Sequence, residues 1–246
     1  MPDARPGAGA IALPGDEARH LSRVLRLGTG ARVRVFDGAG HEWDARVVHA
    51  ARDEARVALD EAVAPAAEPP VRVTLAVALL KGAQMDDVVR DATMLGVVAV
   101  APVESAHVAV AAAGRRSAAA TARWRRVAVA AAKQCGRAVV PAIAPVTPLA
   151  EALASASARG DALVVCVEPR AGWPAAPAGA SAPAALDAPR PAAATVLVGP
   201  EGGWTADELD AARRLGARRL DLGPRTLRAE AVPIVALASL WTRWGW

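Results

Sequence analysis

The sequence predicts a mixed α/β protein of two domains, a β-rich domain over residues 1–66 and a parallel-sheet domain over residues 71–246. Residues 31–38 and 55–63 alternate apolar with charged or polar side chains, with the period of a half-buried strand. After Val71, short apolar strands alternate with helical periods, which is typical of βαβ units and a parallel sheet. Between the two patterns, residues 64–70 contain three prolines and no periodicity, as expected of a linker.

The N-terminal domain is expected to be a small barrel of about sixty residues. Its strands are predicted at 31–38, 41–50 and 55–63. The run from Asp37 to Gly40 has the residues that a hairpin turn favours. Before the strands, residues 16–28 show roughly helical spacing of apolar side chains and end at Gly28, which predicts one helix.

The C-terminal domain is predicted from alternating strands and helices. Strands are expected at 71–80, 97–103, 161–169, 195–200 and 218–223, and helices at 85–95, 117–136, 206–215 and 229–244. Thr205 and Glu208 form a capping-box pattern, and Pro233 fits only the first turn of its helix. Residues 170–191 interrupt the alternation and are expected to be a surface excursion.

Composition favours a soluble, cytosolic protein. No apolar run reaches the roughly 20 residues that a membrane span needs, and no secretion signal is visible. Two cysteines are too few for a disulfide framework or a structural zinc site, so no metal is expected.

Charge points to a nucleic-acid partner. The net charge is +4, and because only Lys81 and Lys133 are lysines, 27 of the 29 basic residues are arginine. A GC-rich coding sequence would also produce many arginines, so this alternative stays open for the total. Placement is more informative, because residues 115–137 hold six arginines and no Asp or Glu.

Two glycine-bearing loops follow strands near the C-terminus: "GPEGG" at 199–203 and "LGPRTLRAE" at 222–230. In open parallel sheets, ligands bind beyond the carboxyl ends of strands, so the two loops predict a shared pocket. Glycine lets a ligand approach the main chain, whose N–H and C=O groups can then recognise a flat heterocycle by hydrogen bonding. Neither loop fits a phosphate-binding or dinucleotide-binding fingerprint. The alternative is that these glycines only form tight turns.

Four motifs in order resemble the ribosomal small-subunit methyltransferase E family: "HLSRVLRLGTGARVRVFDG", "LLKGAQMDDVVRDATMLGV", "AAKQCGRAVVP" and "VGPEGGWTADEL" with "LDLGPRTLRAEA". The resemblance implies a PUA-like β-barrel at the N-terminus and a SPOUT-class domain whose C-terminal segment forms a trefoil knot. It implies methylation of N3 of a uridine in 16S rRNA by S-adenosylmethionine, and a homodimer. By motif, the expected donor-binding residues are Gly199, Pro200, Glu201, Gly202, Gly203, Leu222, Gly223, Arg225 and Leu227.

The reaction requires N3 of uracil to lose its proton while negative charge spreads to the ring oxygens. Arg228 and Glu230 are the predicted catalytic pair. Arg228 is expected to bind a phosphate or a uracil oxygen, and Glu230 to orient it or accept the proton. The alternative is an Arg–Glu ion pair with only a structural role. The candidate rRNA contacts are Arg23, Arg26, Lys81 and Arg137.

Several positions depart from the family pattern. Ala229 and Ala231 stand where hydroxyl residues are usual, and Lys133 and Met94 stand where acids are common. Two other functions therefore remain open. One is a SPOUT methyltransferase acting on another RNA position, such as a ribose 2′-hydroxyl. The other is an RNA-binding or ribosome-assembly factor with weak or no catalysis.

Overall fold

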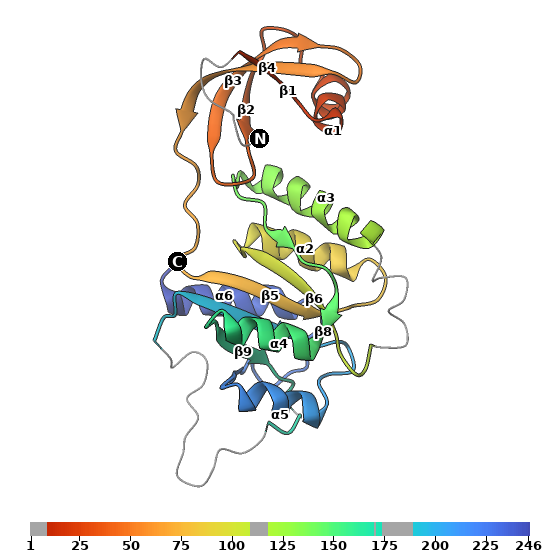
Figure 1. Cartoon of the computed structure of the whole chain (residues 1–246), viewed down its shortest axis with the longest axis vertical. Helices are drawn as coiled ribbons and strands as arrows, with labels where there is room; N and C mark the ends of the chain where they lie inside the picture. Colours follow the sequence, from red (N-terminus) through yellow and green to blue (C-terminus); the bar gives the residue numbers. More distant parts are fainter. Residues whose placement is uncertain (1–8, 109–117, 170, 174–188) are drawn as a thin grey trace. The chain divides into compact units, whose positions relative to one another are not determined.

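The chain folds into two units, shown in Figure 1 as a computed structural model that describes residues 9–108, 118–169, 171–173 and 189–246. The first unit comprises residues 1–67 and 136–140, and the second comprises 68–135 and 141–246. The short segment 136–140 belongs to the first unit because its backbone bonds to the first β-hairpin. The Gly40 amide donates to the Ala138 carbonyl at 3.2 Å, and the Val140 amide donates to the Gly38 carbonyl at 2.9 Å.

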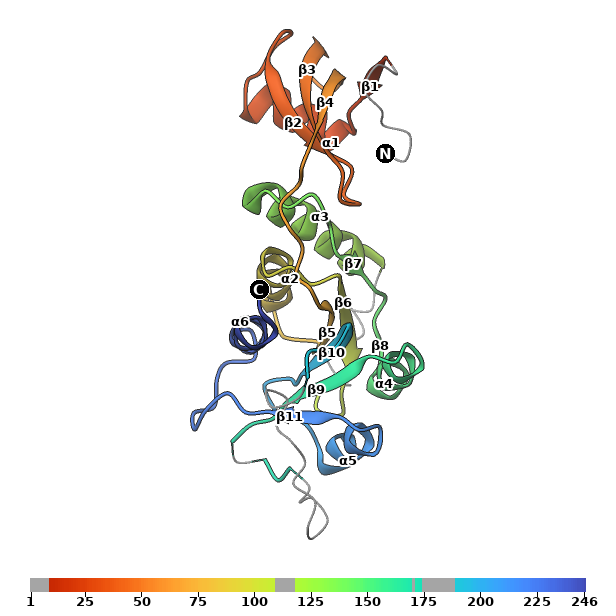
Figure 2. The ribbon, with the colours of Figure 1, turned by 90° about the vertical axis from the view of Figure 1, so that its left-hand side faces the viewer.

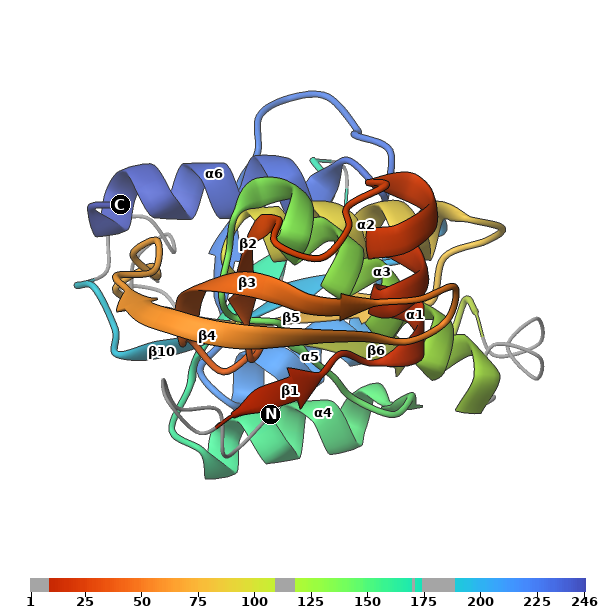
Figure 3. The ribbon, with the colours of Figure 1, turned by 90° about the horizontal axis from the view of Figure 1, so that it is seen from above.

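The first unit is built on a four-stranded antiparallel sheet of order β1-β4-β3-β2. Its elements are β1 (Ala10–Ala12), α1 (Gly15–Arg19), η1 (His20–Val24), β2 (Arg32–Phe36), β3 (Glu42–Ala50) and β4 (Ala55–Val63). Figure 3 shows β3 and β4 as the long central pair. Their inward side chains, including Trp43, Val47 and Val57, pack with Ala18 and Leu21 to form the core.

The predicted hairpin turn is confirmed, and one Asp side chain organises it. The Oδ1 atom of Asp37 accepts the backbone amides of Ala39 at 2.7 Å and His41 at 3.1 Å. Burial acts to raise the pKa of Asp37, but these hydrogen bonds and the His41 side chain outweigh it and lower the pKa.

The single helix predicted over 16–28 is wrong in its second half. The α-helix α1 ends at Arg19, and η1 continues as a wider π-helical turn. The helix prediction placed Val24 and Leu25 on the buried face, whereas these residues are 65% and 52% exposed. Arg26 then adopts a left-handed backbone conformation with φ +54°, which is uncommon for a residue with a Cβ atom. Such irregular backbone is often found at functional positions.

The second unit is a seven-stranded parallel sheet of order β11-β9-β10-β5-β6-β7, with β8 also paired to β6. Its strands are β5 (Arg72–Ala78), β6 (Ala99–Glu104), β7 (Ala142–Ile143), β8 (Thr147–Pro148), β9 (Ala162–Cys166), β10 (Ala193–Val198) and β11 (Arg218–Leu220). Its helices are α2 (Gln84–Met94), α3 (Ala118–Cys135), α4 (Leu149–Ala158), α5 (Ala206–Arg214) and α6 (Val232–Trp244). Figure 2 shows α2 and α6 on one face of the sheet and α4 and α5 on the other.

Most predicted elements of this unit are present, with shifted ends. The capping box of Thr205 and Glu208 is confirmed at the start of α5, and Pro233 lies in the first turn of α6. Helix α4 was not predicted, because its Ala- and Ser-rich sequence shows little apolar contrast. Most of the predicted excursion at 170–191 lies outside the described residues, as do Arg115 and Arg116.

The sheet order places the strands that carry the site side by side. Strand β9 pairs with both β10 and β11, and all three run in the same direction. The segments that leave their carboxyl ends therefore meet at one edge of the sheet, where open parallel sheets bind ligands.

Candidate functional site

A cavity of about 340 Å³ lies beyond the carboxyl ends of β9, β10 and β11. Four segments contribute to its lining: Cys166–Pro169 from the end of β9, most of residues 198–204 from the end of β10, most of residues 222–232 after β11, and Gln84 at the start of α2. This volume falls within the range of small-molecule sites. The two glycine-bearing loops singled out in the sequence thus line the same cavity.

Nearly all predicted donor-binding residues line this cavity. Those in its lining are Gly199, Pro200, Glu201, Gly203, Leu222, Gly223, Arg225 and Leu227, together with the predicted catalytic pair Arg228 and Glu230. Gly202 is not part of the lining. A Cβ atom at this position would lie 3.2 Å from the Cβ atom of His107, so Gly202 serves the packing behind the loop.

The first loop, residues 199–203, is held tightly by its neighbours. A Cβ atom at Gly199 would lie 3.1 Å from Nε1 of Trp204, and one at Gly203 would lie 3.2 Å from Oε1 of Glu168. Gly203 also has φ +69°, a conformation that favours glycine. These positions are therefore bare for a steric reason that is independent of any ligand.

Hydrogen bonds fix the base of the same loop. The indole Nε1 of Trp204 donates to the Cys166 carbonyl at 3.2 Å. The ring nitrogen Nδ1 of His107 lies 2.9 Å from the Gly203 carbonyl oxygen, which accepts its hydrogen bond. Glu208 closes the capping box and accepts the backbone amide of Ala106 at 2.8 Å. The segment after β6 thereby supports the loop.

The second loop, residues 222–228, is more open. Gly223 has φ +99°, and nothing lies within 4 Å of the position that its Cβ atom would occupy. Its amide donates to Oδ1 of Asp221 at 3.0 Å. Arg225 and Arg228 are exposed. This loop is therefore shaped by local turn geometry more than by packing.

Glu230 is held by a partner that sequence reasoning missed. Nε2 of Gln84 donates to Oε2 of Glu230 at 3.1 Å. The alternative of a structural Arg228–Glu230 ion pair is not seen among the described residues. Within the described part of the chain Arg228 has no ion-pair partner, so its guanidinium can act on a ligand. No sequence motif would have paired Gln84 with Glu230, because the two lie 146 residues apart.

Cys166 lines the cavity but is not poised for nucleophilic chemistry. Burial raises the pKa of its thiol to about 12. A thiol with this pKa is almost wholly protonated near neutral pH, and the thiolate is the reactive form. The contribution of Cys166 is its carbonyl group, which anchors Trp204.

The predicted RNA contacts are divided between the two units. Arg23 and Arg26 flank the exposed Val24 and Leu25 in the first unit, where Arg23 forms an ion pair with Asp53 at 3.3 Å. The Lys81 amide donates to Oε1 of Glu201 at 3.3 Å, which places Lys81 beside the first loop. Arg137 is only 6% exposed, so its guanidinium is not presented at the surface.

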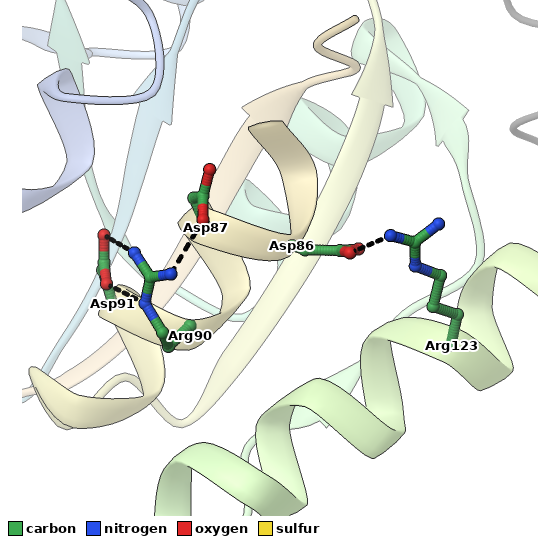
Figure 4. Close-up of polar contacts among 5 residues, drawn as sticks. All are labelled: Asp86, Asp87, Arg90, Asp91 and Arg123. Atoms are coloured by element: carbon green, nitrogen blue, oxygen red, sulfur yellow. Dashed lines mark hydrogen bonds and ion pairs between the residues drawn. The ribbon is translucent and has the colours of Figure 1, made fainter. Parts of the chain in front are cut away.

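The basic segment is partly neutralised by helix α2. Figure 4 shows Arg123 of α3 paired with Asp86 of α2, while Arg90 bridges Asp87 and Asp91 within α2. Arg125 and Arg126 are exposed on α3, which contains no acidic residue. The cationic surface is therefore smaller than the sequence count suggested.

Within the described residues, no helix has the length and apolarity of a membrane span. The same residues contain no group of three or more His, Cys, Asp or Glu side chains arranged to hold a metal ion.

Each of the two units matches a known protein family. Residues 67–241 match an RNA methyltransferase domain family, and residues 13–60 match an RNA methyltransferase PUA domain family. Two proteins named ribosomal RNA small subunit methyltransferase E, one from Synechocystis and one from Mycobacterium tuberculosis, are each 32% identical to this chain. The alignment covers 94% of this chain and 72% of the Synechocystis protein, and 98% of this chain and 91% of the Mycobacterium tuberculosis protein.

Solved structures agree. The crystal structure of a ribosomal RNA small subunit methyltransferase E from Neisseria gonorrhoeae, bound to S-adenosyl methionine, superimposes with a TM-score of 0.84. The two sequences are 30% identical, and the match covers 99% of this chain and 96% of that chain. With both units matched in order and almost the whole chain aligned, the protein belongs to the ribosomal RNA small subunit methyltransferase E family.

Proposed function

We propose that this chain transfers the methyl group of S-adenosylmethionine to N3 of a uridine in 16S rRNA of the small ribosomal subunit. The observation that carries the proposal is the cavity of about 340 Å³ walled by two glycine-bearing loops. Family membership supports the reaction class, and the N. gonorrhoeae relative was solved with S-adenosyl methionine bound. The target atom is inferred from the sequence resemblance and from the groups in the cavity.

The residues around the cavity fit this methyl donor. S-adenosylmethionine supplies a methyl group on a positively charged sulfonium, and it also carries an ammonium group and an adenine ring. Three carboxylates line the cavity, those of Glu168, Glu201 and Glu230, together with the guanidinium groups of Arg225 and Arg228. Such a mixed lining suits a ligand that carries a sulfonium, an ammonium and a carboxylate. Leu222 and Leu227 offer apolar surface, while the glycine-rich backbone offers hydrogen bonds to a heterocycle.

Glu230 is proposed to accept the N3 proton of uracil. Its Oε2 atom is engaged by Gln84, which leaves Oε1 as the oxygen for the proton. Arg228 lines the same cavity and has no ion-pair partner among the described residues. Its role is to bind a phosphate or a uracil oxygen, where negative charge develops. Replacing Glu230 with Gln should lower turnover by about 10²–10⁴ and leave binding of the methyl donor nearly intact.

The rRNA is proposed to contact both units. In the first unit, Arg23 and Arg26 flank two exposed apolar side chains on irregular backbone, a surface suited to phosphates and unstacked bases. In the second unit, Lys81 lies beside the cavity, and Arg125 and Arg126 extend the cationic surface along α3.

A homodimer, a trefoil knot and a cytoplasmic location complete the proposal. Exposed apolar side chains on α6 support the dimer, since Ile234 is 40% and Val235 36% exposed. Trp241 and Trp244, in contrast, are buried within the subunit. Sedimentation velocity tests the dimer directly. The cytoplasmic location follows from the proposed rRNA substrate.

The decisive test maps methylated uridines in 16S rRNA from cells that lack the protein. One N3-methyluridine should disappear, and the purified chain should restore it in vitro with S-adenosylmethionine. Methylation of a ribose 2′-hydroxyl instead would favour a retargeted enzyme. Failure to bind S-adenosylmethionine at any attainable concentration would favour a non-catalytic RNA-binding factor.

A further inference from the structure

The first residue of helix α2 places an amide group in the cavity wall. Nε2 of Gln84 donates to Oε2 of Glu230 at 3.1 Å. A carboxylate oxygen only accepts hydrogen bonds, so the amide nitrogen must face Glu230 and the amide oxygen must face away. That oxygen, Oε1, is buried and has no hydrogen-bond partner in the described part of the chain.

A buried acceptor without a partner is unusual, because nearly all buried polar atoms in proteins are hydrogen-bonded. Gln84 lines the cavity, so a bound molecule is a natural source of the missing donor. Uracil within RNA has a single ring N–H group, at N3, which the proposed function assigns to Glu230. The methyl donor has N–H groups on both its adenine amino group and its ammonium group. The N–H groups of the methyl donor, to which the proposed chemistry assigns no partner, are the candidates for the missing donor.

We propose that Gln84 is a positioning residue that links the methyl donor to the proton acceptor. Its Oε1 accepts a hydrogen bond from an N–H group of the bound donor, while its Nε2 holds the carboxylate of Glu230. Binding of the donor then fixes the amide plane of Gln84, and the fixed amide orients Glu230. This inference rests on the proposed function.

The Gln84→Lys variant tests the acceptor half. A lysine still donates to Glu230 but has no acceptor atom. Calorimetry should show about tenfold weaker binding of S-adenosylhomocysteine, the demethylated product, which corresponds to about 1.4 kcal/mol. The matched control is Gln134→Lys, the same substitution at the exposed glutamine of α3, which should bind normally. Unchanged affinity in Gln84→Lys would overturn the acceptor role.

A truncated ligand identifies which N–H group is read. 5′-Methylthioadenosine keeps the adenine amino group and lacks the ammonium group. If Gln84→Lys weakens its binding by the same factor, the partner lies on the adenosine part, whose amino group is its N–H donor. If its binding is unaffected while S-adenosylhomocysteine binding is weakened, the partner is the ammonium group. Both results support the proposal.

The Gln84→Glu variant tests the link to Glu230. A glutamate keeps an acceptor for the ligand but sets a second carboxylate against Glu230. Binding of S-adenosylhomocysteine should not be weakened, whereas kcat should fall at least tenfold with little change in KM for RNA. An unchanged kcat would overturn the link. A merely structural role for Gln84 would not separate the two measurements in this way.

A third, uncharged variant keeps the test decisive if either charged variant fails to fold. Gln84→Met has similar length and neither donor nor acceptor, so it should lose both ligand affinity and kcat. Normal values for both in a folded Gln84→Met protein would overturn the inference. If the wild-type chain itself neither binds S-adenosylmethionine nor methylates RNA, the proposed function fails as well. If the wild type is active and the Gln84 variants match its ligand affinity and kcat, this inference alone fails.

Discussion

The two loops that wall the cavity are glycine-bearing for different reasons. In the loop 199–203, a Cβ atom at each of the three glycines would come within 3.1–3.2 Å of another side chain. In the loop 222–228, nothing lies within 4 Å of the corresponding position at Gly223. The first loop is packed against Trp204, His107 and Glu168, and the second is a turn with free space around it.

One wall of the site is therefore formed before a ligand binds, whereas the other can adjust to the ligand. The first loop is anchored by the capping box of α5, by the Trp204 indole and by the segment after β6. The second is exposed over much of its length. A preformed wall reduces the ordering cost of binding, and an adjustable wall allows a ligand to enter.

The largest expected effect is that of Gly199→Ala. The new methyl group would press on the Trp204 indole, which is part of the buried core and has little room to move. We expect a loss of about 1–3 kcal/mol in the free energy of unfolding, measured by urea denaturation, and at least tenfold weaker binding of S-adenosylmethionine. Gly28→Ala is the control, since nothing lies within 4 Å and its φ is not left-handed. Equal behaviour of the two variants would contradict the packed-wall account.

Trp204→Phe should have the next largest effect. Phenylalanine removes the indole donor to the Cys166 carbonyl. The expected loss in the free energy of unfolding is about 1–3 kcal/mol. Trp246→Phe serves as the control, because Trp246 is 49% exposed and should tolerate the change. An unperturbed Trp204→Phe protein would show that this hydrogen bond does not hold the first loop.

Gly223→Ala should affect binding with little loss of global stability. The substitution meets no neighbour, so its effect comes from the left-handed backbone, at about 1 kcal/mol for a residue with a Cβ atom. Binding of S-adenosylmethionine, measured by calorimetry, should weaken about fivefold. If the loss in the free energy of unfolding instead equals that of Gly199→Ala, the second loop is packed as tightly as the first.

The smallest effect concerns the two cysteines. Cys135 is exposed, while Cys166 is buried in the wall of the cavity with its pKa raised to about 12 by burial. Between pH 7 and pH 9, a thiol reagent should therefore modify one cysteine rapidly and leave the other, because the Cys166 thiolate forms only at much higher pH. Mass spectrometry of the labelled peptides measures this. Rapid labelling of Cys166 in the folded protein would mean that the first loop opens readily.

Much of the fold was predictable because its signals are local. Alternation over 31–63 reflects strands with one buried face, and the capping box at Thr205 fixes the start of α5. The π-helical turn at His20–Val24 was missed because an apolar side chain counts toward a helix whether or not the fold buries it. Helix α4 was missed because alanine gives little contrast between faces.

The site was predictable in its main chain but not in its side-chain pairs. Loop glycines are visible in sequence, and the parallel-sheet rule brings their loops together. The contacts of Gln84 with Glu230 and of His107 with Gly203 join residues 146 and 96 positions apart. No periodicity or motif carries such pairings, because tertiary packing alone creates them. The same holds for Arg123, which looked free in sequence and is paired with Asp86.

The most direct test of the account is a crystal structure of the chain with S-adenosylhomocysteine. The ligand should lie in the cavity beyond β9, β10 and β11, with backbone contacts from both 199–203 and 222–228. The first loop should keep its position, and any movement should be confined to the second. A ligand bound elsewhere, or one that touches only a single loop, would contradict the central claim.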